Sequence, residues 1–486
     1  MKHRSKSALA AALSFFLLLA GSADAQAPAS SPPDTPQGRR IAALIAAFET
    51  GTPDAIRAFI TANFAASAQK EVPLDQRVQR LGGMAREVGP IAFQQMLPSQ
   101  APEIKFLARA KRTQEWVEIG MMLAPAPDFG ILGWKIDDSP GPGATPETRR
   151  GSDAEVAAAA DALLSAEHGD ATFSGVVLIA KNGKPFFHKA YGMANRDFGV
   201  PNRPDTKFNL GSINKVFTQV AIAQLAEKGK LSLSDTIRKR LPDYPSPVAD
   251  KITIQQLLTM TSGLGDFFGE RYDATPKSRF RTLADFLPMF VNEPLLFEPG
   301  TSRSYSNAGY VVLGLIIEKV SAESYYDYVR QHIFLPAGMK DTDAYMQDAI
   351  VPNRAVGYTR ESEDGKPQPG PRRTNVYTLP ARSSSAGGGY STAQDLLAFD
   401  AAMRADKLLS PAWTGWYFSD KSKAPDAGAA PRKPSGGSGF AGGSPGVNGV
   451  IETDLDTGYS IVVLSNDDPP SAETVAKKIR QWLGLS

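Results

Sequence analysis

The chain has 486 residues, enough to bury a large core and to form more than one domain. Its 53 Lys and Arg residues nearly balance its 51 Asp and Glu residues, so the charge pattern favours neither a nucleic acid nor an anionic membrane surface as a partner. The lack of cysteine excludes disulfides, thiolate metal sites and a cysteine nucleophile, and because none of the four histidines has another at metal-ligand spacing we expect no metal or other cofactor.

The first 25 residues have the three parts of a secretory signal peptide. Residues 2–6 are mostly charged, residues 8–20 are apolar, and Ala23-Asp24-Ala25 fits a small-residue cleavage site. The apolar run is shorter than the roughly 20 residues that span a bilayer, so we expect cleavage after Ala25 and no stable membrane anchor. The mature protein is then periplasmic or secreted, and residues 26–38, rich in Ala, Ser and Pro, are expected to be a flexible leader.

Residues 39–137 are predicted to form a small α+β accessory domain. Apolar residues at helical spacing indicate two short helices at its start. Three strands are then expected, at residues 104–109, 116–123 and 131–136. This layout resembles NTF2-like or cystatin-like accessory domains. The next segment, residues 138–150, has the Pro, Gly and charge content of an interdomain linker.

Residues 151–486 are predicted to form a second, larger domain. Strands are expected near both of its ends, at residues 175–180, 185–191, 449–453 and 459–465. Asn182-Gly183 between the first two favours a tight hairpin, and the last is followed by an amphipathic helix. Since the middle is mostly helical, we expect an α+β fold in which one antiparallel sheet is flanked by helices and carries a large helical insertion.

Ser212 and Lys215 lie at the start of a predicted buried helix. Apolar residues recur at helical spacing after them, so the Ser212 hydroxyl and the Lys215 amine fall on one face, one turn apart. The start of a helix also favours developing negative charge, as a nucleophilic serine requires. The S-x-x-K motif is short, however, and Ser67 to Lys70 matches it too. A capping serine beside a surface lysine is the simpler interpretation of the motif alone.

Three later segments supply the context that favours catalysis. They are ITIQQLLTMTSGL at residues 252–264, Pro299-Gly300 followed by Tyr305-Ser306-Asn307, and the glycine-rich run 439–446. Together with FNLGSINK at residues 208–215, they resemble the serine β-lactamase and penicillin-binding protein superfamily, most closely the class C β-lactamases and their esterase and D-amino-acid peptidase relatives. The resemblance covers roughly residues 155–485.

This resemblance implies roles for five residues. Ser212 would be the nucleophile, Lys215 and Tyr305 would move its proton, and Asn307 would orient Lys215 and the substrate. The backbone N–H groups of Ser212 and Gly443 would form the oxyanion hole. Lysine and tyrosine have ordinary pKa values near 10.4 and 10, so either acts as a base only in surroundings that favour its deprotonated form. The sequence leaves open which of the two is the base, and without Ser212 it would suggest only a buried aromatic residue at Tyr305.

The third motif departs from the pattern of the superfamily. Where Lys-Thr-Gly or His-x-Gly is usual, this chain has Phe440-Ala441-Gly442, which we expect to contact substrate. These residues bring no cation to bind the carboxylate of a β-lactam or a D-Ala terminus. We therefore expect an ester or amide substrate with an apolar or uncharged part. Arg382 is a candidate for a replacement cation.

A competing motif, G-x-S-x-G, occurs at residues 442–446. In α/β-hydrolases the residue after that serine donates an oxyanion N–H and a histidine follows later in the chain, but here Pro445 has no N–H and no histidine follows. We therefore expect a secreted serine hydrolase that acts on a small ester, amide or peptide through a Ser212 acyl-enzyme. The alternatives are a penicillin-binding protein with D-Ala-D-Ala carboxypeptidase activity, a β-lactamase, and a non-catalytic sensor on the same fold.

Overall fold

Two compact units make up the chain, residues 1–144 and residues 145–486. The structure, a computed structural model, describes residues 31–71, 74–111, 116–139, 141–142, 151–166, 173–361, 370–419, 421, 425 and 435–485. Across these ranges, every helix is too short or too polar to cross a bilayer.

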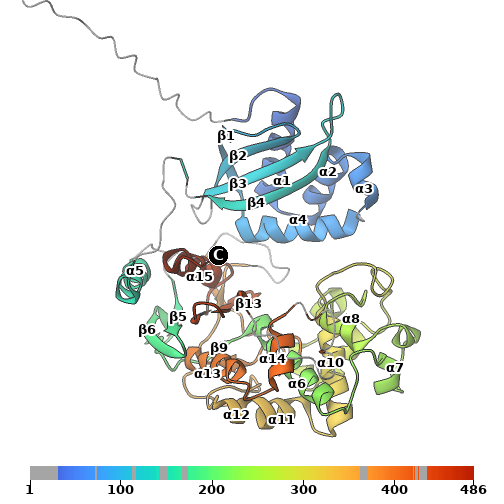
Figure 1. The fold of residues 1–486 in the computed structure, drawn as a ribbon, viewed down its shortest axis with the longest axis vertical. Coiled ribbons are helices and arrows are strands. Elements are labelled where there is room, and N and C mark those ends of the chain that lie inside the picture. Colours follow the sequence, from blue (N-terminus) through green and yellow to red (C-terminus); the bar gives the residue numbers. More distant parts are fainter. Residues whose placement is uncertain are drawn as a thin grey trace, which may run out of the picture. The chain divides into compact units, whose positions relative to one another are not determined.

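The first unit consists of four helices followed by a four-stranded antiparallel meander (Figure 1). Its elements are α1 (Pro36–Thr50), α2 (Pro53–Asn63), α3 (Ala66–Glu71), α4 (Leu74–Val88), β1 (Ile91–Leu97), β2 (Glu103–Ala110), β3 (Trp116–Leu123) and β4 (Ile131–Ser139). Apolar side chains of α1, α2 and α4 share one core with those of the sheet. The two predicted helices and the three predicted strands are therefore confirmed.

Three details of this unit differ from the prediction. Strand β1 was not expected, because a bulge between Phe93 and Gln95 interrupts the alternation that marks a strand. Helix α1 begins inside the predicted leader, at Pro36, because Thr35 caps it by accepting the Gly38 N–H at 3.0 Å. Strand β4 runs on into the predicted linker. The predicted signal peptide and residues 143–150 of the linker lie outside the described residues.

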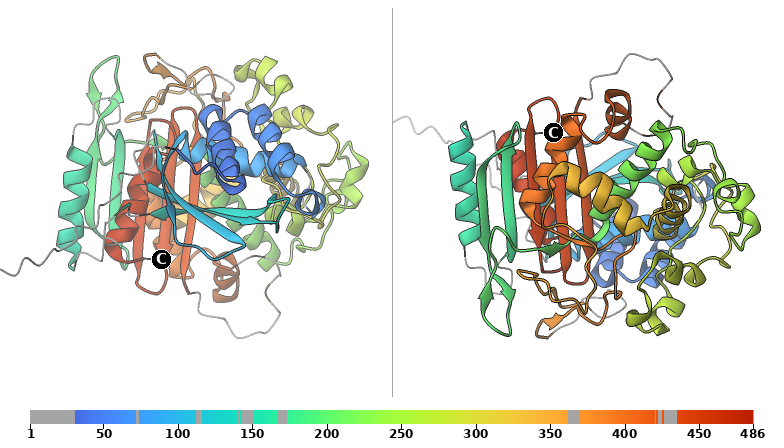
Figure 2. Two further views of the ribbon diagram at one scale, coloured as in Figure 1. Left: turned by 90° about the horizontal axis from the view of Figure 1, so that it is seen from above. Right: turned by 90° about the horizontal axis from the view of Figure 1, so that it is seen from below.

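The second unit is built on a five-stranded antiparallel sheet of order β13-β14-β15-β5-β6. The strands are β5 (Gly175–Lys181), β6 (Lys184–Tyr191), β13 (Gly437–Ser444), β14 (Val447–Asp454) and β15 (Tyr459–Ser465). Strands from the two ends of the unit, green and red in Figure 2, lie side by side because β15 pairs with β5. Asn182 and Gly183 both have positive φ, as a two-residue hairpin turn requires. The predicted single sheet with a helical insertion is confirmed.

The two faces of the sheet are covered by different helices. Val176, Leu178 and Leu464 point into a core shared with α6 (Lys215–Glu227), α10 (Asn307–Ser321) and α13 (Ala393–Arg404). Val177, Ile179 and Val463 point the other way, into a core shared with α5 (Asp153–Ser165) and α15 (Ser471–Leu483). This period of two along each strand is what a sheet buried on both faces requires.

Short elements fill the long insertion and the loops around it. The helices are α7 (Ile237–Arg240), α8 (Ile254–Leu258), α9 (Glu270–Ala274), α11 (Tyr325–Val329), α12 (Leu335–Ala337) and α14 (Pro411–Tyr417). The short strands are β7 (Met193–Asn195), β8 (Val200–Pro201), β9 (Phe208–Asn209), β10 (Tyr358–Thr359), β11 (Arg373–Thr374) and β12 (Tyr390–Ser391). Further helical turns among the described residues are Gly211–Asn214, Pro247–Asp250, Lys277–Arg279, Leu283–Met289 and Arg330–Phe334. Helix α6 passes through the centre of this insertion, and almost all of its residues are buried.

Candidate active site

Ser212 lies in a 3-10 turn, Gly211–Asn214, and α6 begins only at Lys215. The predicted helix therefore starts one short turn later than expected. Gly211 has φ of 50°, and a Cβ atom at this position would lie 2.9 Å from the backbone nitrogen of Gly443. Only glycine allows this close approach without strain. The turn that carries Ser212 is thus packed directly against strand β13.

The Ser212 hydroxyl is within hydrogen-bond reach of two other functional groups. Tyr305 donates its hydroxyl hydrogen to Ser212 Oγ at 2.6 Å, and Lys215 Nζ lies 3.3 Å from the same oxygen. Lys215 Nζ also lies 4.7 Å from the centre of the Tyr305 ring. The structure therefore brings the predicted hydroxyl, amine and phenol together in one place.

Lys215 is fully buried, and its amine has two further partners. Nζ donates to Asn307 Oδ1 at 2.7 Å and to the carbonyl oxygen of Ala386. Burial lowers the pKa of Lys215 to about 7, although the negative charge of Asp266 acts in the opposite direction. Near neutral pH, Lys215 is therefore a neutral amine with a lone pair in a substantial fraction of the molecules.

Tyr305 precedes α10, whose N-cap is Ser306. The tyrosine is 43% exposed, but burial of its phenol raises its pKa to about 12, more than the hydrogen bond with Ser212 lowers it. At neutral pH the hydroxyl is therefore protonated and acts as a donor to Ser212. The two candidate bases are separated by their surroundings, with the amine near its titration point and the phenol far from it.

Asn307 connects Lys215 to a carboxylate that sequence reasoning missed. Its Nδ2 donates to Asp266 Oδ2 at 2.7 Å, while its Oδ1 accepts from Lys215. Asp266 stands two residues beyond the segment 252–264, and only its position in space links it to the site. Burial raises the pKa of Asp266, whereas the hydrogen bonds from Phe268 and Asn307 and the charge of Lys215 lower it.

Strand β13 forms the open edge of the large sheet beside Ser212. It is joined to β14 by the two-residue turn Pro445-Gly446, so Ser444 and Val447 are the hydrogen-bonded pair next to the turn. In an antiparallel ladder the following pair, Gly443 and Asn448, is not hydrogen-bonded, which directs the Gly443 N–H toward the open edge. Ser212 and Gly443 line the same cavity, as their predicted oxyanion roles require.

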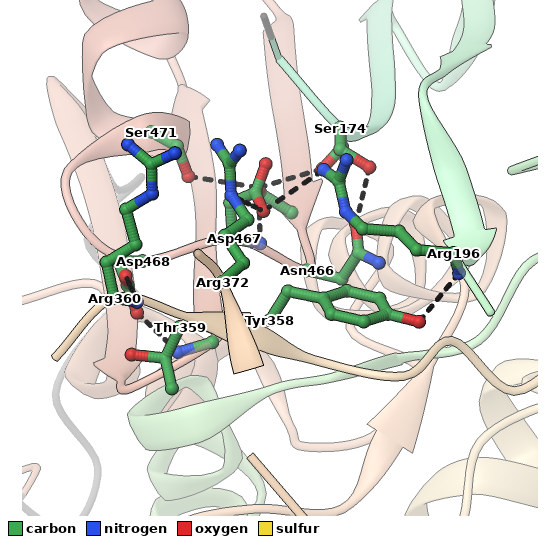
Figure 3. Close-up of polar contacts among 12 residues, drawn as sticks. Ser174, Arg196, Tyr358, Thr359, Arg360, Arg372, Asn466, Asp467, Asp468 and Ser471 are labelled. Carbon is green, nitrogen blue, oxygen red and sulfur yellow. Dashed lines mark hydrogen bonds and ion pairs between the residues drawn. The ribbon is translucent and has the colours of Figure 1, made fainter. Parts of the chain in front are cut away.

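The turn after Gly443 is held by the segment that follows β15, in which Asp467 and Asp468 lie among arginine side chains and backbone (Figure 3). Asp468 accepts the Gly446 N–H at 2.7 Å through one oxygen and the Arg360 N–H at 2.8 Å through the other. Asp467 lies between the guanidinium groups of Arg196 and Arg372, at 3.4 and 3.2 Å. These contacts fix the end of β13 relative to the neighbouring strands.

The structure does not place the side chains of Phe440, Ala441 and Gly442 in the cavity where substrate contact was predicted. Strand alternation points Phe440 into the helix-covered core, Ala441 is exposed, and none of the three lines the cavity. Gly442 instead allows β13 to approach Ser212, since a Cβ there would lie 2.7 Å from the Ser212 nitrogen. Arg382 does not line the cavity either, because its Nε donates to the Ala344 carbonyl and its guanidinium lies over the Tyr326 ring.

The cavity at Ser212 has a volume of about 980 Å³. One side is an aromatic wall made of Phe267, Phe268 and Tyr272, in which neighbouring ring centres lie 4.4 to 5.5 Å apart. Among the described residues that line the cavity, Lys277 is the one cation, and its Nζ donates to backbone carbonyl oxygens, including that of Tyr272 at 2.6 Å. The cavity is therefore apolar on one side, and its one cation is already engaged.

The second S-x-x-K copy lies outside this site. Ser67 is exposed on α3, in the first unit. Within the described ranges, no three His, Cys, Asp or Glu side chains gather as metal ligands would.

Comparison with known proteins matches residues 160–485 to the Beta-lactamase family model. The chain is similar to penicillin-binding protein 4* of Bacillus subtilis (strain 168), with 34% identity over 254 residues, which are 51% of this chain and 56% of that protein. The chain thus spans about half the length of this curated relative. The match leaves the first unit unassigned, so its resemblance to NTF2-like or cystatin-like domains stays a prediction.

Two solved structures show the same fold. A penicillin-binding protein from Bacillus halodurans aligns with a TM-score of 0.56 and 31% identity, over 64% of this chain and 97% of that one. EstCE1, described as a hydrolase with promiscuous acyltransferase activity, aligns with a TM-score of 0.55 and 22% identity, over 68% of this chain and 98% of that one.

Proposed function

The chain belongs to the Beta-lactamase family of serine hydrolases, and from this premise we propose that it cleaves an ester or amide bond through an acyl-enzyme on Ser212. One observation carries the proposal: Ser212 Oγ lies 2.6 Å from a neutral phenol and 3.3 Å from a buried amine whose pKa is about 7. A serine hydroxyl becomes an effective nucleophile only when a neighbouring base removes its proton.

In the proposed mechanism Lys215 is the general base. As a neutral amine it donates its two N–H bonds to Asn307 and Ala386, which leaves its lone pair for the Ser212 hydrogen. Ser212 Oγ then attacks the carbonyl carbon of the substrate, and the proton moves to Lys215. Because burial raises the pKa of Tyr305 to about 12, its phenol is protonated at neutral pH and acts as a hydrogen-bond donor in this step.

Breakdown of the tetrahedral intermediate requires a proton for the leaving group. Tyr305 is the donor nearest to Ser212 Oγ, and the Lys215 ammonium beside its ring stabilises the phenolate that remains. The backbone N–H groups of Ser212 and Gly443 stabilise the oxyanion, and loss of one such donor costs about 3 kcal/mol in comparable enzymes. Water then attacks the acyl carbonyl carbon and gives a proton to the Tyr305 phenolate. The bond to Ser212 Oγ breaks, the acid product is released, and the Lys215 ammonium returns its proton to Ser212.

The substrate we propose is a small ester or amide with an apolar part and no carboxylate next to the scissile bond. The aromatic wall favours an apolar group, and the three N–H bonds of Lys277 are donated to backbone carbonyls, which leaves none of them for a substrate carboxylate. A second candidate, penicillin-binding or carboxypeptidase activity, is favoured by the similarity to penicillin-binding protein 4*.

Steady-state hydrolysis of p-nitrophenyl butyrate and of nitrocefin by the mature chain tests the proposal. We expect the ester to be turned over faster than nitrocefin, S212A to lose activity on both, and S67A to behave like the wild type because Ser67 is exposed on α3. Nitrocefin turnover well above ester turnover would contradict the substrate class. Full activity in S212A would contradict the nucleophile, and a folded but inactive wild type would favour the sensor alternative.

We also propose that the mature protein is periplasmic or secreted. The support is the sequence of residues 1–25, with its charged start, apolar run and A-x-A cleavage site. Edman sequencing of the exported protein should give Gln26 as the first residue, and a cytoplasmic protein that retains Met1 would contradict this placement.

A further inference from the structure

Asp266 closes a chain of three side chains that ends at the nucleophile. Its Oδ2 accepts the Nδ2–H of Asn307 at 2.7 Å, and Asn307 Oδ1 accepts from Lys215 Nζ at the same distance. An amide group donates at one end and accepts at the other, and a carboxylate only accepts. The Asp266 carboxylate therefore determines which end of Asn307 faces Lys215.

The orientation of Asn307 decides whether Lys215 can act as a base. With Oδ1 toward Lys215, the two N–H bonds of a neutral amine go to Asn307 and Ala386, and the lone pair remains for Ser212. With the amide turned over, Nδ2 would donate to that lone pair and compete with the Ser212 hydroxyl. Turning it over would also leave two oxygens, Asn307 Oδ1 and Asp266 Oδ2, facing each other without a hydrogen between them.

Asp266 is itself held by the segments that build the site. Its Oδ1 accepts the Phe268 N–H at 3.2 Å, within the loop that follows Gly265. Ser306, which lies between Tyr305 and Asn307, donates its hydroxyl hydrogen to the Gly265 carbonyl at 2.8 Å. The loop that carries the carboxylate and the start of α10 are thus fixed to each other.

The surroundings of Asp266, Asn307 and Lys215 make Lys215 the group that titrates near neutral pH. Tyr272, Tyr305 and Tyr310 face the site, and burial raises the pKa of each above its ordinary value. Asn307 lies between Asp266 and Lys215 and is hydrogen-bonded to both, so the charge of Asp266 acts on Lys215 across this amide. When Lys215 takes the serine proton, the new positive charge is balanced by this carboxylate.

We propose that Asp266 is a positioning residue for catalysis, which fixes the Asn307 amide with Oδ1 toward Lys215 and balances the charge that Lys215 gains during acylation. This inference rests on the proposed function, because it requires Lys215 to be the base. It adds a fifth side chain to the predicted set of Ser212, Lys215, Tyr305 and Asn307, and one that never touches the substrate's reacting atoms.

The test compares D266N, D266L and the control E270Q by ester kinetics from pH 5 to pH 10. In D266L the amide loses its charged partner, and a lost hydrogen bond of this kind corresponds to a roughly 10- to 100-fold fall in kcat. D266N is nearly isosteric and can still accept from Asn307, so a smaller fall in kcat is expected. Its acid limb should move to lower pH, because the charge that raises the pKa of Lys215 is gone. KM should change little in either variant.

Glu270 is exposed in the first turn of α9 and does not line the cavity. E270Q therefore removes a nearby charge and leaves the hydrogen bonds between Asp266, Asn307 and Lys215 in place. It should keep the wild-type kcat and acid limb. Wild-type kcat and an unmoved acid limb in D266N would overturn the inference, as would a loss confined to KM or to melting temperature. If D266L does not fold, D266N decides. A folded wild type without ester turnover would overturn the proposed function, and this inference with it.

Discussion

Gly211→Ala should damage catalysis much more than stability, because of where the new methyl group would lie. A Cβ at residue 211 would be 2.9 Å from the Gly443 nitrogen and 3.0 Å from the Gly442 carbonyl carbon, whereas ordinary contacts begin at 3.4 Å. Both neighbours are backbone atoms, so strand β13 would have to move by about half an ångström. That movement displaces the proposed oxyanion donor, and displacements of this order cost up to about 100-fold in rate. We expect kcat to fall between about 10- and 100-fold.

Gly229→Ala is the matched control for this variant. Gly229 also has a positive φ, 66°, but a Cβ there meets nothing within 4 Å. Both variants carry the backbone strain of a left-handed alanine, about 1–2 kcal/mol, so urea titration should show similar losses in the free energy of unfolding. Ester kinetics should then separate them, with G229A keeping its kcat. Equal kcat values for G211A and G229A would refute the placement of Gly443 beside the reacting carbonyl.

Three further predictions concern proton transfer and the support of strand β13. Burial raises the pKa of Tyr305 to about 12, so its phenol stays protonated between pH 8 and pH 10. We therefore expect kcat/KM to form a plateau over that range. A loss of activity there would indicate that catalysis needs a different protonated group, with a pKa near 9. Tyr305→Phe removes the donor to Ser212 and should lower kcat by about 10²–10⁴-fold with little effect on melting temperature; retention of activity would remove Tyr305 from the mechanism. Asp468→Ala leaves the Gly446 and Arg360 N–H groups without their acceptor, and we expect a loss of about 1–3 kcal/mol in unfolding free energy together with a fall in kcat. An unchanged kcat in destabilised D468A would show that β13 keeps its position without this contact.

The sequence was sufficient for the parts of the site that depend on local spacing. Ser212 and Lys215 lie one turn apart, and Tyr305 and Asn307 flank the N-cap of one helix. The sheet was predictable as well, because alternation and the Asn182-Gly183 turn mark its strands. Resemblance to a known superfamily then suggested that these distant segments meet.

Other features depend on facts that the sequence does not contain. Phe440 was expected to contact substrate, but its place in a motif does not show that its side chain packs against the helix-covered core and not in the cavity. Asp266 was missed because its partner is 41 residues away in the chain and the contact joins a loop to the start of α10. The bulge at Phe93 hid β1 in a similar way, since pairing rather than composition shows where the extra residue lies.

The most direct test of the account is covalent labelling of Ser212 with a fluorophosphonate, followed by intact mass and peptide mapping at several pH values. We expect one label per chain, on Ser212, with none on S212A and normal labelling of S67A. Because the pKa of Lys215 is about 7 and only its neutral form removes the serine proton, the labelling rate should rise with pH and reach half its maximum near pH 7. A folded protein that takes no label, a label on another residue, or a rate that does not change between pH 5 and pH 9 would contradict the proposal that a buried amine activates this serine.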